Sequence, residues 1–232
     1  MPGYVMHLAV AEKIIRQCRI IDKKYINEFV IGSIVPDAVE RNDKRYSHFW
    51  DDDTYGKFER KPNLEMFLAK YKERLCEPYV FGYYCHLYLD RQFMDRYWSR
   101  HFKFYDDSME AEEAFDLVTK VLLTDNNTVY GRAEFFSDKY YYGDYDRLNP
   151  YILKKYEVQT PELVVPEHEI DEISVNVVKE SLRKRLEMVT HTSMSDAYED
   201  VRVFNVADFE KLMDDTSKEL CECYMSIVRK MQ

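Results

Sequence analysis

The sequence predicts a single all-α domain, and three observations support this prediction. The 232 residues are 46% hydrophobic, which is enough to bury one sizeable core. Apolar residues recur with helical spacing in several long segments. The alternation of apolar and polar residues that marks a strand persists only in a short extended piece at Val201 to Phe204. We therefore expect one helical domain over residues 1–232.

The first two helices are expected to carry two polar side chains to the core. In the segment His7 to Ile21 the apolar residues share one face with His7, so this imidazole is expected to point inward. A second apolar helix runs from Tyr25 to Ile34. It stops before Pro36, whose ring disfavours helical angles at the preceding residue, and this leaves Asp37 at the helix end or in the turn that follows.

The next two helices follow a polar connection from Arg41 to Arg60 that carries His48. A short helix is expected over Asn63 to Leu75, and Pro78, which suits a first helical turn, opens another that runs to about Trp98. Its stretch from Tyr79 to Leu89 has no charge, which is typical of a helix buried on all sides, yet it contains His86 and is followed by Asp90.

Gly82 lies one turn before His86 in this helix. Glycine costs about 1 kcal/mol relative to alanine inside a helix, which indicates the close approach of another backbone or an open space. We expect the Pro36–Asp37 turn to approach there.

Residues 101–232 are expected to complete the helical domain and to cover a cleft, while the metal-site residues lie in 1–100. Asp107 and Glu110 resemble a capping box ahead of a helix from Ala111 to Leu123. The Asn-, Asp-, Gly- and Tyr-rich segment from Thr124 to Asn149 is expected to form turns and helix fragments over the cleft, with Tyr140 to Tyr145 in packing contacts. Further helical patterns cover Tyr151 to Tyr156, Ile170 to Val189, and the segment from Asn205 as N-cap through Val228.

Charge and cysteine usage restrict the functional classes. The 33 basic and 43 acidic residues give a net charge of −10, so no nucleic-acid partner is expected. The five cysteines are odd in number and scattered, and we expect reduced thiols. Polar residues interrupt the N-terminal segment where a signal peptide would need an apolar run, and no stretch of about 18 apolar residues predicts a membrane span. We therefore expect a cytoplasmic protein.

Five side chains form the candidate site: His7, Asp37, His48, His86 and Asp90. His86 and Asp90 are four residues apart on one helix, so an imidazole nitrogen and a carboxylate oxygen can reach the same ion. Three imidazoles and two carboxylates supply the ligands that zinc accepts, enough for one complete site or two incomplete ones. A buried hydrogen-bonded pair is the alternative interpretation of His86 with Asp90.

Four motifs in this order resemble the bacterial zinc-dependent phospholipase C family, which is related to the single-strand-specific zinc nucleases. They are His7, Gly32-Ser33-Ile34-Val35-Pro36-Asp37, Ser47-His48-Phe49, and Gly82-Tyr83-Tyr84-Cys85-His86-Leu87-Tyr88-Leu89-Asp90. The resemblance covers about the first hundred residues. It implies an all-α fold, a cleft that binds up to three zinc ions, and hydrolysis of phosphoesters. It also implies that Asp37, His48, His86 and Asp90 surround one metal, that Asp90 faces a second metal held by His7, and that Asp37 doubles as the catalytic base.

The chain departs from the family pattern beyond these motifs. Family enzymes carry another histidine soon after the His-x-x-x-Asp helix and then a His-x-x-x-Glu helix. Here His101 is the only nearby histidine, Tyr105 stands four residues after it, and the spacing recurs only far along the chain at His168 and Glu172. We expect His101, His168 and His191 at the surface and Asp51 to Asp53 in a solvated loop.

The sequence thus predicts a metal-dependent hydrolase that holds one or two zinc ions, or another divalent transition metal, and acts on a small phosphoester. The alternative is a non-catalytic metal-binding or protein-interaction module that retains a reduced metal site. The net charge of −10 argues against a nuclease.

Overall fold

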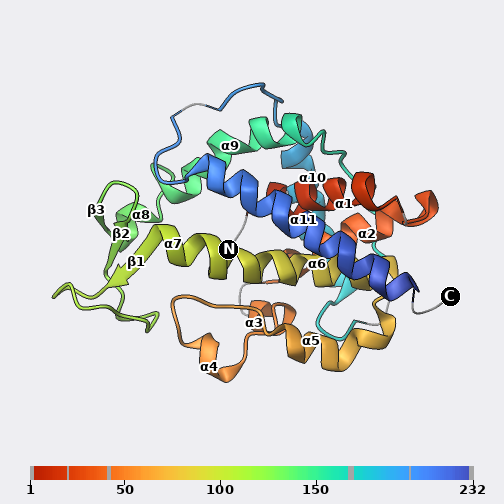
Figure 1. Cartoon of the computed structure of the whole chain (residues 1–232), viewed down its shortest axis with the longest axis horizontal. Coiled ribbons are helices and arrows are strands. Elements are labelled where there is room, and N and C mark those ends of the chain that lie inside the picture. Colours follow the sequence, from red (N-terminus) through yellow and green to blue (C-terminus); the bar gives the residue numbers. More distant parts are fainter. Residues whose placement is uncertain (1–2, 20, 41–42, 167–169, 199, 230–232) are drawn as a thin grey trace.

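The computed structural model describes residues 3–19, 21–40, 43–166, 170–198 and 200–229, and most of these residues are helical (Figure 1). The helices are α1 (Tyr4–Cys18), α2 (Ile26–Ile34), α3 (Lys44–Ser47), α4 (Asp52–Tyr55), α5 (Leu64–Tyr71), α6 (Pro78–Gln92), α7 (Ser99–His101), α8 (Arg132–Phe135), α9 (Tyr141–Lys155), α10 (Val175–His191) and α11 (Val206–Arg229). Between them lie 3₁₀ turns at Lys23–Tyr25, Val35–Ala38 (η2) and Lys72–Arg74, and a π-helical turn at Phe93–Trp98. The prediction of a mainly helical protein is confirmed.

Helix α6 is the central element, and nearly all of its residues are buried. It crosses α2 at two glycines, with the backbones in direct contact. A Cβ at Gly82 would lie 2.2 Å from the carbonyl oxygen of Phe29, and a Cβ at Gly32 would lie 2.2 Å from that of Tyr79. The predicted close approach at Gly82 is confirmed, but its partner is α2 rather than the Pro36–Asp37 turn, because each glycine makes room for the other helix.

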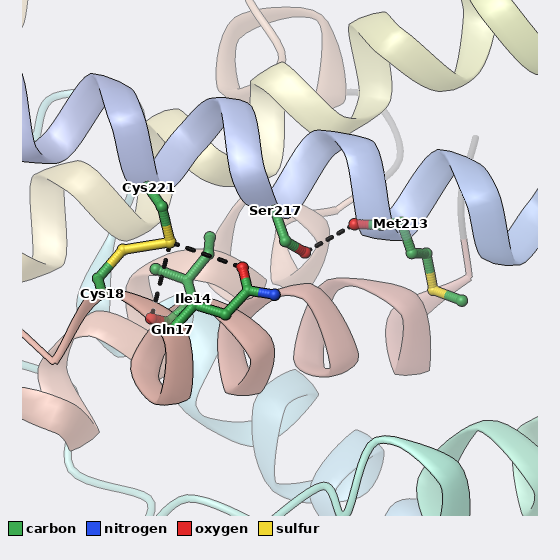
Figure 2. Close-up of a disulfide and its surroundings, with 6 residues drawn as sticks. All are labelled: Ile14, Gln17, Cys18, Met213, Ser217 and Cys221. Atoms are coloured by element: carbon green, nitrogen blue, oxygen red, sulfur yellow. Dashed lines mark hydrogen bonds between the residues drawn. A yellow bond between two sulfur atoms is a disulfide. The ribbon is translucent and has the colours of Figure 1, made fainter.

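Helix α11 packs against α1 and α6 and crosses the molecule in Figure 1. A disulfide joins Cys18, at the end of α1, to Cys221 on α11 (Figure 2). The expectation of reduced thiols is therefore wrong for these two cysteines. They are 203 residues apart in sequence, and only the packing of the first helix against the last brings them together.

A small sheet corrects the expectation that the chain has no strands. Strands β1 (Phe102–Tyr105), β2 (Lys120–Leu123) and β3 (Thr128–Gly131) pair antiparallel in the order β1-β2-β3. Phe102 lies opposite Leu123, and Lys120 lies opposite Gly131.

The helix predicted from Ala111 to Leu123 is absent, although every residue of this segment is described. Asp106 accepts hydrogen bonds from the backbone N–H groups of Ser108 and Glu110. The chain therefore forms a turn here, instead of the helix cap predicted from Asp107 and Glu110. The segment then contributes β2, in which Val121 and Leu123 are buried.

The extended piece expected at Val201 to Phe204 is not a strand. It is held by the buried carboxylate of Asp144 on α9, which accepts hydrogen bonds from the backbone N–H groups of Val203 at 2.7 Å and Phe204 at 3.1 Å. Arg147 donates to the same carboxylate at 2.9 Å. One side chain of α9 thus orders the chain before α11.

Helices α10 and α11 lie close to their predicted segments, whereas α9 is much longer than predicted. Helix α9 begins at Tyr141, ten residues before the predicted start, and continues through Pro150. Helix α10 begins at Val175 rather than Ile170. Helix α11 begins after Asn205, whose side-chain oxygen accepts from the Asp208 N–H, as expected of an N-cap. None of the helices among the described residues is long and apolar enough to cross a membrane.

Candidate metal centre

Five side chains from four segments meet in the interior. Helix α1 supplies His7, the turn η2 supplies Asp37, the residue after α3 is His48, and α6 supplies His86 and Asp90. All five are buried, with exposed fractions between 0 and 6%. They form two groups whose ligand atoms lie within 4.8 Å of one another: His7, His86 and Asp90 in one, and Asp37, His48 and His86 in the other. The structure therefore brings together all the sequence-predicted site residues.

Backbone and hydroxyl partners orient the two central imidazoles. His86 Nδ1 donates to the Ser33 carbonyl oxygen at 2.9 Å. The Ser47 hydroxyl donates to the Pro36 carbonyl oxygen at 3.0 Å, so at 2.9 Å it accepts from His48 Nδ1. These partners assign the ring proton to Nδ1 in both residues and leave each Nε2 with a lone pair.

The two Nε2 atoms face each other at 3.3 Å. Two lone pairs at this distance repel unless a cation or a proton lies between them. Two imidazole ligands of a tetrahedral zinc, each with a Zn–N distance of 2.0–2.1 Å, are separated by about 3.3 Å. The separation of the two Nε2 atoms therefore matches that of two imidazole ligands on one zinc ion.

Asp90 faces both groups. Its Oδ1 lies 3.4 Å from His7 Nε2, and its Oδ2 lies 3.6 Å from His48 Nε2 and 3.9 Å from His86 Nε2. Among the described residues, neither oxygen has a hydrogen-bond partner. A buried carboxylate without donors is costly, so this arrangement fits a site in which a cation supplies the missing interaction.

The ionisation of the centre suits metal ligands. Burial, reinforced by the nearby His7, lowers the pKa of His86 to about 3, so this imidazole is neutral at pH 7. Burial opposes the charge on Asp90, but the positive charge that His86 carries when protonated is the largest effect that holds the pKa of this carboxyl below its usual value. His7 stacks on His86, with ring centroids 3.8 Å apart.

Lys44 is a site residue that sequence reasoning missed. Its Nζ lies 2.5 Å from Asp37 Oδ1, while His48 Nε2 lies 3.5 Å from the same oxygen. Burial opposes the charge on Asp37, but Lys44 leads the groups that hold the pKa of this carboxyl well below its usual range. The sequence did carry a sign of this role. Lys44 precedes His48 by four residues, about one helical turn, so the two side chains can lie on the same side of the chain.

A cavity of about 570 Å³ adjoins the centre. Lys44 and Trp50 form the connecting wall, since Lys44 contacts Asp37 and the Trp50 ring lies 5.3 Å from the His48 ring. The other lining residues are Phe58, Arg60, Met94, Trp98, Phe115, Arg132, Ala133, Phe136 and Tyr142. Residues from the predicted covering segment, including α8 and the start of α9, thus line this cavity.

The predicted packing role of the Tyr140–Tyr145 segment is confirmed for Tyr141 but not for Tyr142. Tyr141 is buried and packs on Trp98 and Phe204, with ring centroids 5.3 and 5.1 Å away. Tyr142 is exposed and lines the cavity.

The other histidines lie elsewhere. The expectation of a surface His101 is wrong, because this residue is 1% exposed, with Nδ1 2.8 Å from Asp125 Oδ1 and Nε2 3.2 Å from Asp208 Oδ2. His191 is exposed, as expected. His168 lies outside the described residues. Glu172, which follows His168 by four residues, accepts from Lys70 and from the Tyr71 hydroxyl on α5.

Asp51 differs from the expected solvated loop. It caps α4, because its Oδ1 accepts from the Thr54 N–H at 2.9 Å and its Oδ2 accepts from Asn63 Nδ2 at 2.9 Å. Asp52 and Asp53 are exposed, as predicted.

Comparisons with protein-family models, with curated proteins and with solved structures find no match to this chain. The chemistry of the centre is therefore interpreted from its own geometry and motifs.

Proposed function

We propose that this protein is a metal-dependent hydrolase of phosphoesters, as its resemblance to zinc-dependent phospholipase C implies. His7, Asp37, His48, His86 and Asp90 hold the metal. The observation that carries the proposal is the pair of Nε2 atoms 3.3 Å apart, each with its Nδ1 committed as a donor, beside a buried carboxylate without a donor. Nitrogen and carboxylate ligands in this number favour zinc.

The donor set supports one or two ions. One ion would lie in the group of Asp37, His48 and His86, and a second would lie in the group that contains His7. Because the single lone pair on His86 Nε2 can bind only one ion, Asp90 is the residue that can serve both. One of its oxygens is directed toward His7 and the other toward His48.

In this proposal the metal supplies a coordinated water whose pKa is lowered to about 7, and hence a hydroxide at neutral pH. Asp37, next to Lys44 at the cavity wall, orients the attacking water and takes its proton. The Lys44 ammonium keeps Asp37 ionised and lies where it can donate to a phosphoryl oxygen of a substrate in the cavity. The His86 imidazole remains a neutral ligand oriented by the Ser33 carbonyl oxygen, and the Ser47 hydroxyl orients the His48 ring.

The test combines metal analysis with two substitutions. Protein purified without added metal is analysed for zinc and other transition metals, and is then assayed with p-nitrophenyl phosphate and bis-p-nitrophenyl phosphate. His86→Ala and Asp90→Asn are expected to lose both bound metal and turnover. His191→Ala, which changes an exposed histidine, serves as the matched control. A metal content near zero, with turnover unaffected by either substitution, would refute the proposal.

One observation favours a second candidate, a non-catalytic module with a structural metal. The Lys44 ammonium already engages the carboxylate that would act as the base. Three results together would favour this candidate. The site would be closed and four-coordinate, chelation would remove the metal and unfold the protein, and neither ester would be hydrolysed.

A further inference from the structure

The cavity beside the centre is cationic, although the whole chain has a net charge of −10. Lys44, Arg60 and Arg132 line it, and no carboxylate is among its described lining residues. Lys44 pairs with Asp37, whereas Arg132 pairs with no carboxylate among the described residues. Apolar walls around such an arginine favour an anionic ligand.

The two guanidinium groups are held in place by aromatic rings. Arg132 lies 4.3 Å from the Phe115 ring centroid and 5.1 Å from that of Phe58. Arg60 lies 4.4 Å from the same Phe115 ring and 5.4 Å from Trp50. Two cations flanking one ring form a rigid, charged wall.

Arg132 retains donors for a ligand. Its Nη1 donates to the carbonyl oxygens of Phe115 at 2.6 Å and Val118 at 3.2 Å, which fixes the side chain. Its Nε and Nη2 have no hydrogen-bond partner among the described residues. None of the carboxylates of these residues pairs with the Arg132 guanidinium. An arginine held in this way offers two parallel N–H groups, the geometry that binds a carboxylate or phosphate.

The charged wall connects to the metal centre through Trp50. The Trp50 ring lies 5.3 Å from the His48 ring on one side and 5.4 Å from the Arg60 guanidinium on the other. Phe58, Trp98 and Phe136 supply apolar surface in the same cavity. A molecule that reaches from the metal to the arginines would therefore pass along aromatic walls.

We propose, on the basis of the proposed phosphoesterase function, that this cavity selects substrates with a second anionic group. That group is a carboxylate or a further phosphate, joined to the scissile phosphoester through a small apolar or aromatic part. Lys44 contacts the scissile phosphate, and Arg60 and Arg132 bind the second anion. Water adds to phosphorus, the P–O bond to the organic part breaks, and the alcohol leaves with a proton. A cationic head group is rejected because like charges would meet.

Three aryl phosphates with matched leaving groups test the proposal: phenyl phosphate, 4-(carboxymethyl)phenyl phosphate and 4-(aminomethyl)phenyl phosphate. We expect kcat/KM to be about 10- to 100-fold higher for the carboxymethyl compound than for phenyl phosphate, mostly through KM, as one charge-assisted contact provides. The aminomethyl compound is expected to be the poorest substrate. Arg132→Gln should remove most of the preference, and Arg132→Lys should restore part of it.

Arg183→Gln is the matched control, because Arg183 is exposed on α10 and pairs with Glu180 and Glu187. It should keep the preference of the wild type. Because Arg132 also holds two carbonyl groups, thermal unfolding of each variant checks that the fold is retained.

Calorimetry on the chelator-treated wild type separates this proposal from the proposed function. Tighter binding of 4-(carboxymethyl)phenyl phosphate than of the aminomethyl compound by the chelator-treated protein, without turnover of any ester by the zinc-loaded protein, would support the anion site and refute the hydrolase. Equal kcat/KM for the three esters in an active enzyme would overturn the anion site and leave the hydrolase intact. Absence of both binding and turnover would overturn both.

Discussion

The substitution Gly82→Ala tests the helix crossing that positions the residues of the candidate metal centre. The added Cβ would lie 2.2 Å from the Phe29 carbonyl oxygen and 2.9 Å from the Ser33 backbone nitrogen. Ordinary contact begins at about 3.4 Å, so α2 and α6 must separate locally by about 1.2 Å, the difference between 3.4 and 2.2 Å. Both obstacles are backbone atoms, so no side-chain rotation can relieve the clash.

The expected cost follows from two opposing terms. Overpacking a core costs up to about 3 kcal/mol, while alanine gains about 1 kcal/mol over glycine in a helix. The net loss is therefore about 2 kcal/mol, which lowers Tm by about 4 to 8 °C for a chain of this size. The same displacement would lengthen the 2.9 Å bond from His86 Nδ1 to the Ser33 carbonyl oxygen beyond hydrogen-bond range. Loss of such a supporting bond typically weakens metal affinity by about 10- to 100-fold.

Thermal unfolding of the metal-free protein and zinc titration measure the two effects separately. Gly56→Ala is the control, because nothing lies within 4 Å of a Cβ at Gly56, and its φ of −78° suits alanine. It should leave both quantities nearly unchanged. If Gly82→Ala matched wild type in Tm and in zinc affinity, the inferred contact between α2 and α6 would be refuted.

Three further predictions concern stability. Cys221→Ser, or reduction of the wild type, opens the loop of 203 residues closed by Cys18 and should cost about 2 to 5 kcal/mol; an unchanged Tm in reductant would contradict this. Asp144→Ala leaves three backbone N–H groups and Arg147 without their carboxylate, and chemical denaturation should show a loss of about 3 to 5 kcal/mol. Asp51→Asn should cost about 1 kcal/mol near neutral pH. Hydrogen bonds from Asn63 and Thr54 lower the pKa of Asp51, so its contribution is present above the unfolded pKa of about 3.9 and disappears as the pH falls through the folded pKa. A stability difference between Asp51→Asn and wild type that stayed constant from pH 7 to pH 2 would contradict this assignment.

Much of the helical architecture could be predicted, because helical spacing is a local property. The uncharged run in α6 predicted burial on all sides, and Gly82 predicted a backbone contact. Convergence of the five site residues could be anticipated from motif order, and the structure brings their ligand atoms together. That they bind a metal stays a prediction.

The missed features depend on partners far apart in sequence. The strands are four residues long, too short for a periodic signal, and β2 is stabilised by pairing with its neighbours rather than by its own pattern. His101 is buried, and the carboxylates beside its ring nitrogens belong to Asp125 and Asp208, which are 24 and 107 residues away in sequence. The disulfide and the cationic cavity arise in the same way, from side chains that only the folded chain places together.

The disulfide also acts on the candidate metal centre, as a rotational constraint. Cys18 follows His7 by 11 residues, and three helical turns take 10.8 residues, so the two side chains leave α1 on nearly the same side, about 16 Å apart along the axis. Anchoring Cys18 to α11 fixes how far α1 can turn about its own axis. The direction in which His7 points is thereby set by a covalent bond at the opposite end of its helix.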